Sequence, residues 1–275
     1  MVLGVPLCEL AWPVVALLAG GFVMGLLSGM LGLGGGAILV PILFETFRTI
    51  GVDDAFRMQL CVGTSLAVIV PTSLRAYASH YRRGAVDTDL MRTMILPVVA
   101  GVTIGSLIAK LVHSDTLMAV WVALATLMSI RFLIGARHWR IADTLPGLGF
   151  RIPYGVFMGT MSSLMGIGVS AFMTTWMSLY GRPLTQSVAV SAGLGVAVAV
   201  AGTLGYVWAG WDASGLPPGS VGYVSLLGAA VIVPVSVLAA PIGVALAHGI
   251  PRRALELAFA GFLAFASLRF LFVLI

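Results

Sequence analysis

Long apolar runs separated by short polar segments dominate the sequence. Each run is about 20 residues long, which is the length that an α-helix needs to cross a hydrocarbon core roughly 30 Å thick. The runs do not alternate between apolar and polar residues, as the strands of an outer-membrane barrel would. The pattern therefore predicts an all-α fold, a polytopic transmembrane helical bundle. Apolar runs and helix breakers place its segments at 11–31, 37–47, 59–79, 91–112, 116–135, 154–166, 169–180, 185–209, 221–247 and 253–274.

The chain contains an internal repeat. GFVMGLLSGMLGLGGGA at 21–37 aligns without a gap with GVFMGTMSSLMGIGVSA at 155–171. Later in each half, Arg131–Phe132–Leu133 aligns with Arg269–Phe270–Leu271. Such self-similarity predicts two transmembrane repeats of about five helical segments each. The first repeat covers residues 1–135 and the second covers 153–275, with a polar cytoplasmic connector at 136–152 that contains Gly and Pro.

Basic residues in short loops predict that the two repeats are inverted relative to each other. Arg82, Arg83 and Arg92 surround the loop after the third segment, whereas the equivalent AGWDASGLPPGS at 209–220 has no basic residue. Because Lys and Arg favour cytoplasmic loops, these equivalent loops are expected on opposite sides of the membrane. Both chain ends are then expected outside. The first residues lack the basic region of a secretory signal, so we expect them to remain in the mature protein.

Composition narrows the possible functions. Hydrophobic residues make up 60% of the chain and charged residues 9%, against about 45–50% and about 25% in soluble domains. The net charge of +5 is scattered over short loops, so it indicates membrane orientation and no nucleic-acid partner. Cys8 and Cys61 are the only cysteines, without a Cys/His cluster, so neither a metal nor another cofactor is expected.

Glycine-rich stretches interrupt the helical pattern at the same place in each half. These stretches are SGMLGLGGG at 28–36 and SSLMGIGVS at 162–170. Because each glycine costs a helix interior about 1 kcal/mol, their density indicates a functional break. Matched breaks in inverted repeats are typical of a transporter site, where freed N–H groups and half-helix N-termini hold an anion. The predicted substrate-binding residues here are Ser28, Gly32, Gly34, Gly35, Gly36, Ser162, Gly166, Gly168 and Ser170.

Close helix packing is the alternative explanation for some of these glycines. Small residues four positions apart let transmembrane helices approach each other, and the pairs Gly21 with Gly25 and Gly155 with Gly159 fit that explanation better. The denser glycines at the breaks exceed what packing requires.

Hydroxyl groups and arginines within apolar segments form a second group of candidates. Thr64, Ser65 and Ser191 could donate to a substrate oxyanion, or bond back to the preceding helical turn. Arg75 could attract an anion, or extend its charge to the cytoplasmic interface. Arg131 and Arg269 lie near helix ends and are predicted to be interfacial anchors. The identity of the coupling ion stays undetermined, because no acidic residue lies deep in a predicted span.

Enzyme functions do not fit the motifs. GLGGGA at 32–37 is similar to a dinucleotide-binding loop, but no strand precedes it and no acidic residue follows about 20 positions later. The absence of a following lysine excludes a phosphate-binding P-loop. Ser28 and Ser162 have no histidine base at matching depth, since all four histidines lie in or beside loops. The sequence therefore predicts no enzyme activity.

Three stretches together resemble a known family. GLLSGMLGLGGGAILVPIL at 25–43, VGTSLAVIVPTSL at 62–74 and HYRRGAVD at 80–87 resemble the sulfite exporter TauE/SafE family of membrane permeases. The resemblance implies a multi-pass permease in the bacterial inner membrane that exports sulfite, an organosulfonate such as sulfoacetate or a related small anion. The second half has GVS at 168–170 where the first has GGG, so the two half-sites are not expected to bind identically.

These features predict a secondary transporter whose broken helices meet near the membrane midplane and hold an oxyanion. The repeats would rock around that site to give alternating access. Its expected partners are a small anionic substrate and the lipid bilayer. An anion channel and a non-transporting membrane assembly component stay open as alternatives, as does a homo-oligomeric state. The sequence also leaves open whether the short segments 37–47 and 169–180 span the membrane or re-enter it.

Overall fold

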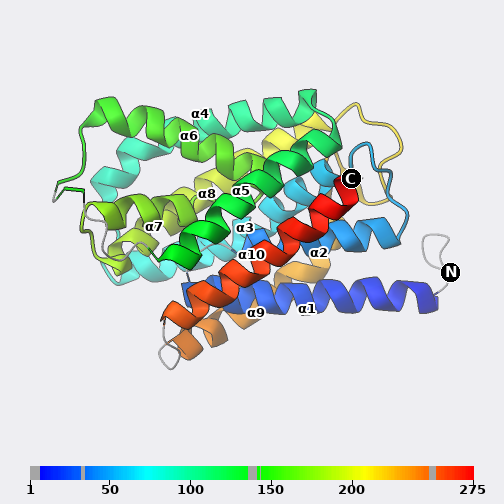
Figure 1. The fold of residues 1–275 in the computed structure, drawn as a ribbon, viewed down its shortest axis with the longest axis horizontal. Helices are drawn as coiled ribbons and strands as arrows, with labels where there is room; N and C mark the ends of the chain where they lie inside the picture. The colour runs from blue at the N-terminus through cyan, green and yellow to red at the C-terminus, as the bar shows by residue number, and fades with distance from the viewer. Residues whose placement is uncertain (1–6, 32–34, 136–140, 143, 248–251) are drawn as a thin grey trace.

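The computed structural model describes residues 7–31, 35–135, 141–142, 144–247 and 252–275. These residues form ten α-helices and one short β-hairpin, arranged as a bundle in Figure 1. The elements are α1 (Leu7–Leu31), α2 (Gly36–Thr49), α3 (Arg57–Arg82), α4 (Thr88–Leu111), α5 (Ser114–Ile134), α6 (Leu148–Met165), α7 (Ser170–Leu179), α8 (Leu184–Ala209), β1 (Ser220–Val221), β2 (Val224–Ser225), α9 (Leu226–Ala247) and α10 (Arg252–Leu274).

Six helices of the described chain are long and apolar enough to cross a membrane, namely α3, α4, α5, α8, α9 and α10. Helix α1 contains a shorter apolar stretch, Val14–Ser28. Large apolar side chains such as Phe265 and Phe272 are exposed on the outside of the bundle, where lipid would surround them. The predicted all-α, polytopic membrane fold is therefore confirmed.

The first helix of each half packs against the fourth helix of the other half. Helix α1 lies along α9, and the equivalent helix α6 lies along α4. Close approach is possible because small residues lie at these contacts: Gly25 meets the backbone of Ser236, and Gly159 meets the backbone of Val98. The paired glycines of both halves thus lie at helix contacts, and each contact joins the two halves.

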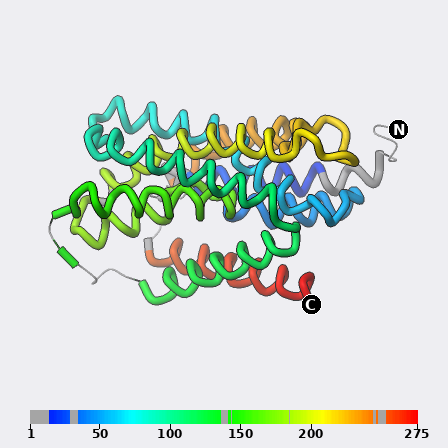
Figure 2. Tube along the Cα trace, turned by 90° about the horizontal axis from the view of Figure 1, so that it is seen from above, coloured from blue at the N-terminus to red at the C-terminus, as the bar shows by residue number. Residues whose placement is uncertain are grey.

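Equivalent helices of the two halves run antiparallel. Helices α3 and α8 pack along each other, with Gly63 beside Tyr206 at one end and Gly195 beside Ser73 towards the other. Helices α5 and α10 form the second such pair, seen along one side of the bundle in Figure 2. Inverted repeats would have opposite directions in such equivalent helices, and the inversion of the two repeats as wholes stays a prediction.

Both predicted interruptions coincide with glycine motifs. Helix α1 ends at Leu31 and α2 begins at Gly36, while α6 ends at Met165 and α7 begins at Ser170. Gly35, Gly166 and Gly168 have φ angles of 62°, 68° and 68°. Residues with a Cβ rarely adopt this left-handed conformation, so glycine is the residue that permits each break. The predicted site residues Gly32 and Gly34 lie outside the described residues.

Two helix starts differ most from the predicted ones, those of α9 (226 against 221) and α6 (148 against 154). Helix α9 begins at Leu226 instead of 221, because a β-hairpin occupies the preceding residues. Tertiary hydrogen bonds hold the backbone of this hairpin in place. The Tyr223 amide donates to the Tyr206 carbonyl at 3.1 Å, and the Ser225 amide donates to Thr64 Oγ1 at 2.9 Å. Helix α6 begins at Leu148, within the predicted connector, and its first turn bonds to the Gly147 carbonyl.

Candidate functional site

The two glycine breaks meet in the interior of the bundle. Gly36, the first residue of α2, lies so close to the carbonyl oxygen of Gly166 that a Cβ atom on Gly36 would overlap it. Ser65 of α3 is fully buried, and its hydroxyl donates a 2.8 Å hydrogen bond to the same carbonyl oxygen. One contact therefore joins the break of the first half, α3 and the break of the second half.

Two glycines of the second break have different surroundings. Gly166 is closely packed, since a Cβ atom there would lie 3.2 Å from Val40 and from the backbone of Val62. Gly168 is also buried, but a Cβ atom built on it meets no described heavy atom within 4 Å. The break thus combines one glycine required for close packing with another whose Cβ position contacts none of the described atoms.

Ser162 fixes the orientation of the peptide that follows Gly168. Its buried hydroxyl donates to the Gly168 carbonyl oxygen at 3.0 Å. Because a trans peptide places its N–H opposite its C=O, the Val169 N–H points away from Ser162. The amides of Gly168, Val169 and Ser170 donate to no acceptor among the described residues. They lie at the positive end of α7, where a helix leaves its first N–H groups unpaired and favours an anion.

The first break is described in less detail because part of it lies outside the described residues. Ser28 is partly exposed on α1, unlike its buried equivalent Ser162. Gly35 precedes α2, and no side chain caps that helix. A Cβ atom on Gly35 would collide with Met24 of α1, so this glycine is needed for close packing.

The other predicted site residues are not gathered at one point. The Thr64 hydroxyl accepts from the Ser225 amide, and the Ser191 hydroxyl donates to the Ser187 carbonyl in the preceding turn at 2.6 Å. Because α3 and α8 are antiparallel, Ser191 lies about four turns, roughly 20 Å, along α8 from the level of Thr64. Arg75 is exposed on α3. Within the part of the chain that the structure describes, Ser65 is the member of this group that bonds to a helix break.

Tyr206 is a buried polar residue that the sequence motifs did not single out. It lies on α8, is fully buried and donates from its hydroxyl to the Ser163 carbonyl at 3.1 Å. The bond joins α8 to the last turns of α6, immediately before the second break. An isolated tyrosine within an apolar helix was the available signal, because a buried hydroxyl there needs a partner.

The described residues contain no group of three His, Cys, Asp or Glu side chains that could hold a metal ion. The described part of the site therefore offers hydroxyls, carbonyls and unpaired amides. These groups suit reversible binding of a small polar ligand.

Two broken helices that meet inside a helical membrane bundle are a feature typical of secondary transporters. The sequence matches the family Sulfite exporter TauE/SafE over residues 17–270, and the chain belongs to this family.

Similar proteins occur in bacteria and in an archaeon. A Haemophilus influenzae protein named "Probable membrane transporter protein" is 25% identical over 244 residues, which cover 88% of this chain and 92% of that protein. A protein of the same description from Methanocaldococcus jannaschii is 26% identical, over 75% of this chain and 76% of its own length. The Bacillus subtilis protein YdhB, also so described, is 24% identical over 69% and 77%. No solved structure is significantly similar to the chain.

Proposed function

We propose that the chain is a secondary transporter that exports a small oxyanion, with sulfite and organosulfonates as the first candidates. The observation that carries the proposal is the meeting of the two helix breaks at Gly36, Ser65 and Gly166. Inverted-repeat transporters place their substrate between such discontinuous helices. The family description supplies the substrate class and the direction of transport.

The chemistry of the second break favours an anion. Among the described residues, no heavy atom lies within 4 Å of a Cβ built on Gly168, and the amides of Gly168, Val169 and Ser170 have no acceptor. Helix N-termini bind sulfate- and phosphate-like groups through such amides. Sulfite and sulfonates present three oxygen acceptors on one sulfur atom, so one ligand can accept from several amides. In this proposal Gly36 and Ser65 hold the two breaks together while the α7 amides bind the ligand.

The helix pairs that cross between the halves support alternating access. Helices α1 and α9 form one unit and α4 and α6 form the other, and each unit contains helices from both repeats. The antiparallel pair α3 and α8 lies between the repeats. Rocking of the two units relative to this pair would open the breaks to one side of the membrane and then to the other.

Gly168→Leu tests this site in proteoliposomes loaded with ³⁵S-labelled sulfite. The new side chain would extend beside the amides that bind the ligand in this proposal. We expect at least about a tenfold lower initial rate of efflux, which corresponds to a loss of roughly 1.4 kcal/mol of binding. Gly84→Leu is the matched control, because Gly84 has a similar φ of 66° and equally free surroundings but lies in an exposed loop. Equal efflux from both variants would reject the site.

Trans-stimulation separates a transporter from a channel in the same vesicles. Unlabelled sulfite outside should accelerate efflux of labelled sulfite through an alternating-access carrier, since return of the loaded site is faster than return of the empty one. Efflux that does not respond would favour a channel. Repeating the assay with sulfoacetate, thiosulfate and acetate ranks the substrates.

A further inference from the structure

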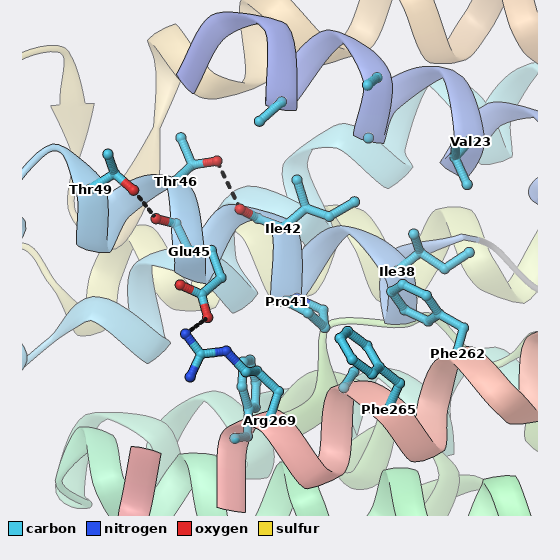
Figure 3. Close-up of a pocket in the computed structure, with 15 residues that line it drawn as sticks. Val23, Ile38, Pro41, Ile42, Glu45, Thr46, Thr49, Phe262, Phe265 and Arg269 are labelled. Carbon is cyan, nitrogen blue, oxygen red and sulfur yellow. Dashed lines mark hydrogen bonds and ion pairs between the residues drawn. The ribbon is translucent and has the colours of Figure 1, made fainter. Parts of the chain in front are cut away.

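A cavity of about 540 Å³ lies between α1, α2 and α10, on a face of α2 separate from its contact with Gly166. Figure 3 shows apolar side chains such as Ile38, Ile42 and Phe262 around it and the charged pair Glu45 and Arg269 towards one end. Its volume is in the range of about 300–1,000 Å³ that is typical of small-molecule sites. The cavity is thus large enough for a ligand and is almost entirely apolar.

Several residues that line this cavity have aromatic counterparts in the second half. The aligned stretch has an offset of 134 positions (155 − 21), and when this offset is extended along α1 and α2, six of the lining residues pair with larger aromatic residues. Gly20 corresponds to Tyr154, Ile42 to Trp176 and Thr46 to Tyr180; likewise Ala16, Val23 and Ile38 correspond to Phe150, Phe157 and Phe172.

The aromatic side chains of the second half pack against one another. The rings of Tyr154 and Trp176 are stacked with centroids 5.3 Å apart, and Trp176 meets Tyr180 at 5.7 Å. Phe150 and Phe157 extend the cluster on either side of Tyr154, at 5.9 and 6.3 Å. The second half therefore packs aromatic rings against one another at positions where smaller side chains line the cavity in the first half.

The charged end of the cavity carries a surplus positive charge. Arg269 Nη2 lies 3.0 Å from Glu45 Oε1, and Arg48 Nη1 lies 3.8 Å from Glu45 Oε2. Two guanidinium groups thus share one carboxylate, and all three side chains are between 41% and 48% exposed. An apolar cavity with a surplus cation at its end is complementary to an apolar chain with an anionic headgroup.

The depth and position of the cavity match one membrane leaflet. Arg48 is in the last turn of α2, and Arg269 is about one and a half turns from the end of α10, so both lie near the membrane boundary. From Thr49 the lining extends along α2 to Ile38, a distance of roughly 16 Å. Half of a hydrocarbon core is about 15 Å. Phe265 and Val23, exposed by 69% and 41%, place the opening on the lipid-facing side.

We propose that this cavity binds one acyl chain of an anionic phospholipid, whose phosphate lies against Arg269 and Arg48. The chain would extend from the charged end towards Ile38, two residues after Gly36. A lipid bound there would support α2 from its outer side. This proposal does not depend on which anion the protein transports.

Thermal unfolding and native mass spectrometry of the purified full chain test the proposal with dioleoyl phosphatidylglycerol and dioleoyl phosphatidylcholine. Phosphatidylglycerol should remain bound and raise the Tm, because ligand binding stabilises the folded state. Phosphatidylcholine should bind more weakly. Arg269→Gln should weaken phosphatidylglycerol binding about fivefold, as expected for one basic residue at an anionic headgroup. Arg131→Gln, at the equivalent position of the filled half, should leave binding unchanged.

A second variant tests the apolar part of the site. Ala16→Phe with Val23→Phe copies the residues of the filled half, and it should abolish the Tm increase from phosphatidylglycerol. Val15→Phe is the control, since Val15 is exposed on α1 and does not line the cavity. Equal binding of the two lipids, or retained binding in both Arg269→Gln and the filled variant, would overturn the proposal. Loss of a dimer in the filled variant without loss of lipid would instead indicate an interface between copies.

Discussion

The hydroxyl of Ser65 donates to the carbonyl oxygen of Gly166 over 2.8 Å, between residues 101 positions apart. Gly166 caps the C-terminal end of α6, where the last carbonyl groups of a helix lack intrahelical donors. Ser65 supplies the missing donor from the third helix of the other half. This bond stabilises the position at which the two interrupted helices meet.

Ser65→Ala should destabilise the protein. The buried Gly166 carbonyl would lose its side-chain donor, which costs about 1–3 kcal/mol. Thermal unfolding in detergent should show a lower Tm, and vesicle efflux should fall. Thr72→Val in the same helix is the control, because the Thr72 hydroxyl bonds only to carbonyls of its own helix, Val68 and Ile69. An unchanged Tm for Ser65→Ala would show that the bond contributes little.

Gly36→Ala should strongly destabilise the protein although it adds only one methyl group. Its methyl group would overlap the Gly166 carbonyl oxygen, and backbone cannot move aside as a side chain can. We expect a loss of about 3 kcal/mol and reduced transport. Gly261→Ala in α10 is the control, since no described atom lies within 4 Å of a Cβ there, and better helix propensity should stabilise it by up to about 1 kcal/mol. Similar Tm values for both variants would contradict the close contact.

Ser162→Ala should affect ligand binding more than turnover. Without the Ser162 hydroxyl the peptide after Gly168 is no longer held, so the Val169 amide would be less well oriented. We expect KM for sulfite to rise about three- to tenfold, corresponding to roughly one hydrogen bond, while kcat changes little. Ser163→Ala is matched in position and burial, and the Ser163 hydroxyl has no partner among the described residues. An equal KM in both variants would exclude a role of Ser162 in orienting the amide.

Arg253→Gln should weaken the contact between α10 and α5. The Arg253 guanidinium donates to the carbonyls of Phe132, at 2.7 Å, and Leu133 in the last turn of α5. A cation there satisfies unpaired carbonyls at the negative end of the helix, so its loss should cost about 1–2 kcal/mol. Arg83→Gln, in an exposed loop, should leave the Tm unchanged. A Tm drop of the same size in both variants would point to loss of charge alone.

Local sequence was sufficient to predict the helices and their breaks. A backbone in lipid must satisfy its hydrogen bonds within the same helix, so long apolar runs specify spans with little help from distant residues. Glycine marked the breaks because Gly166 and Gly168 adopt left-handed φ angles that other residues avoid. The hairpin at 220–225 was missed because its bonds go to Thr64 and Tyr206, far away in the sequence.

The candidate site was predicted only in part. The repeat indicated which glycines would form the breaks, but it grouped Ser191 with Ser65, and these two residues lie at different levels of the bundle. Hydroxyls in helices look alike in a sequence whether they bond to their own turn, as Ser191 does, or to another element, as Ser65 does. Packing alone distinguishes the two cases.

The sequence by itself determined an all-α membrane bundle, its internal repeat and its two glycine breaks, because periodicity and backbone freedom are local properties of a chain. Only the tertiary structure decided that Gly36 would lie on the Gly166 carbonyl and that the Gly168 carbonyl would accept from Ser162. It also decided that α1, α2 and α10 would enclose a cavity where the other half is filled by aromatic rings. These outcomes depend on which side chains meet across helices, and that is fixed by packing between residues far apart in the sequence.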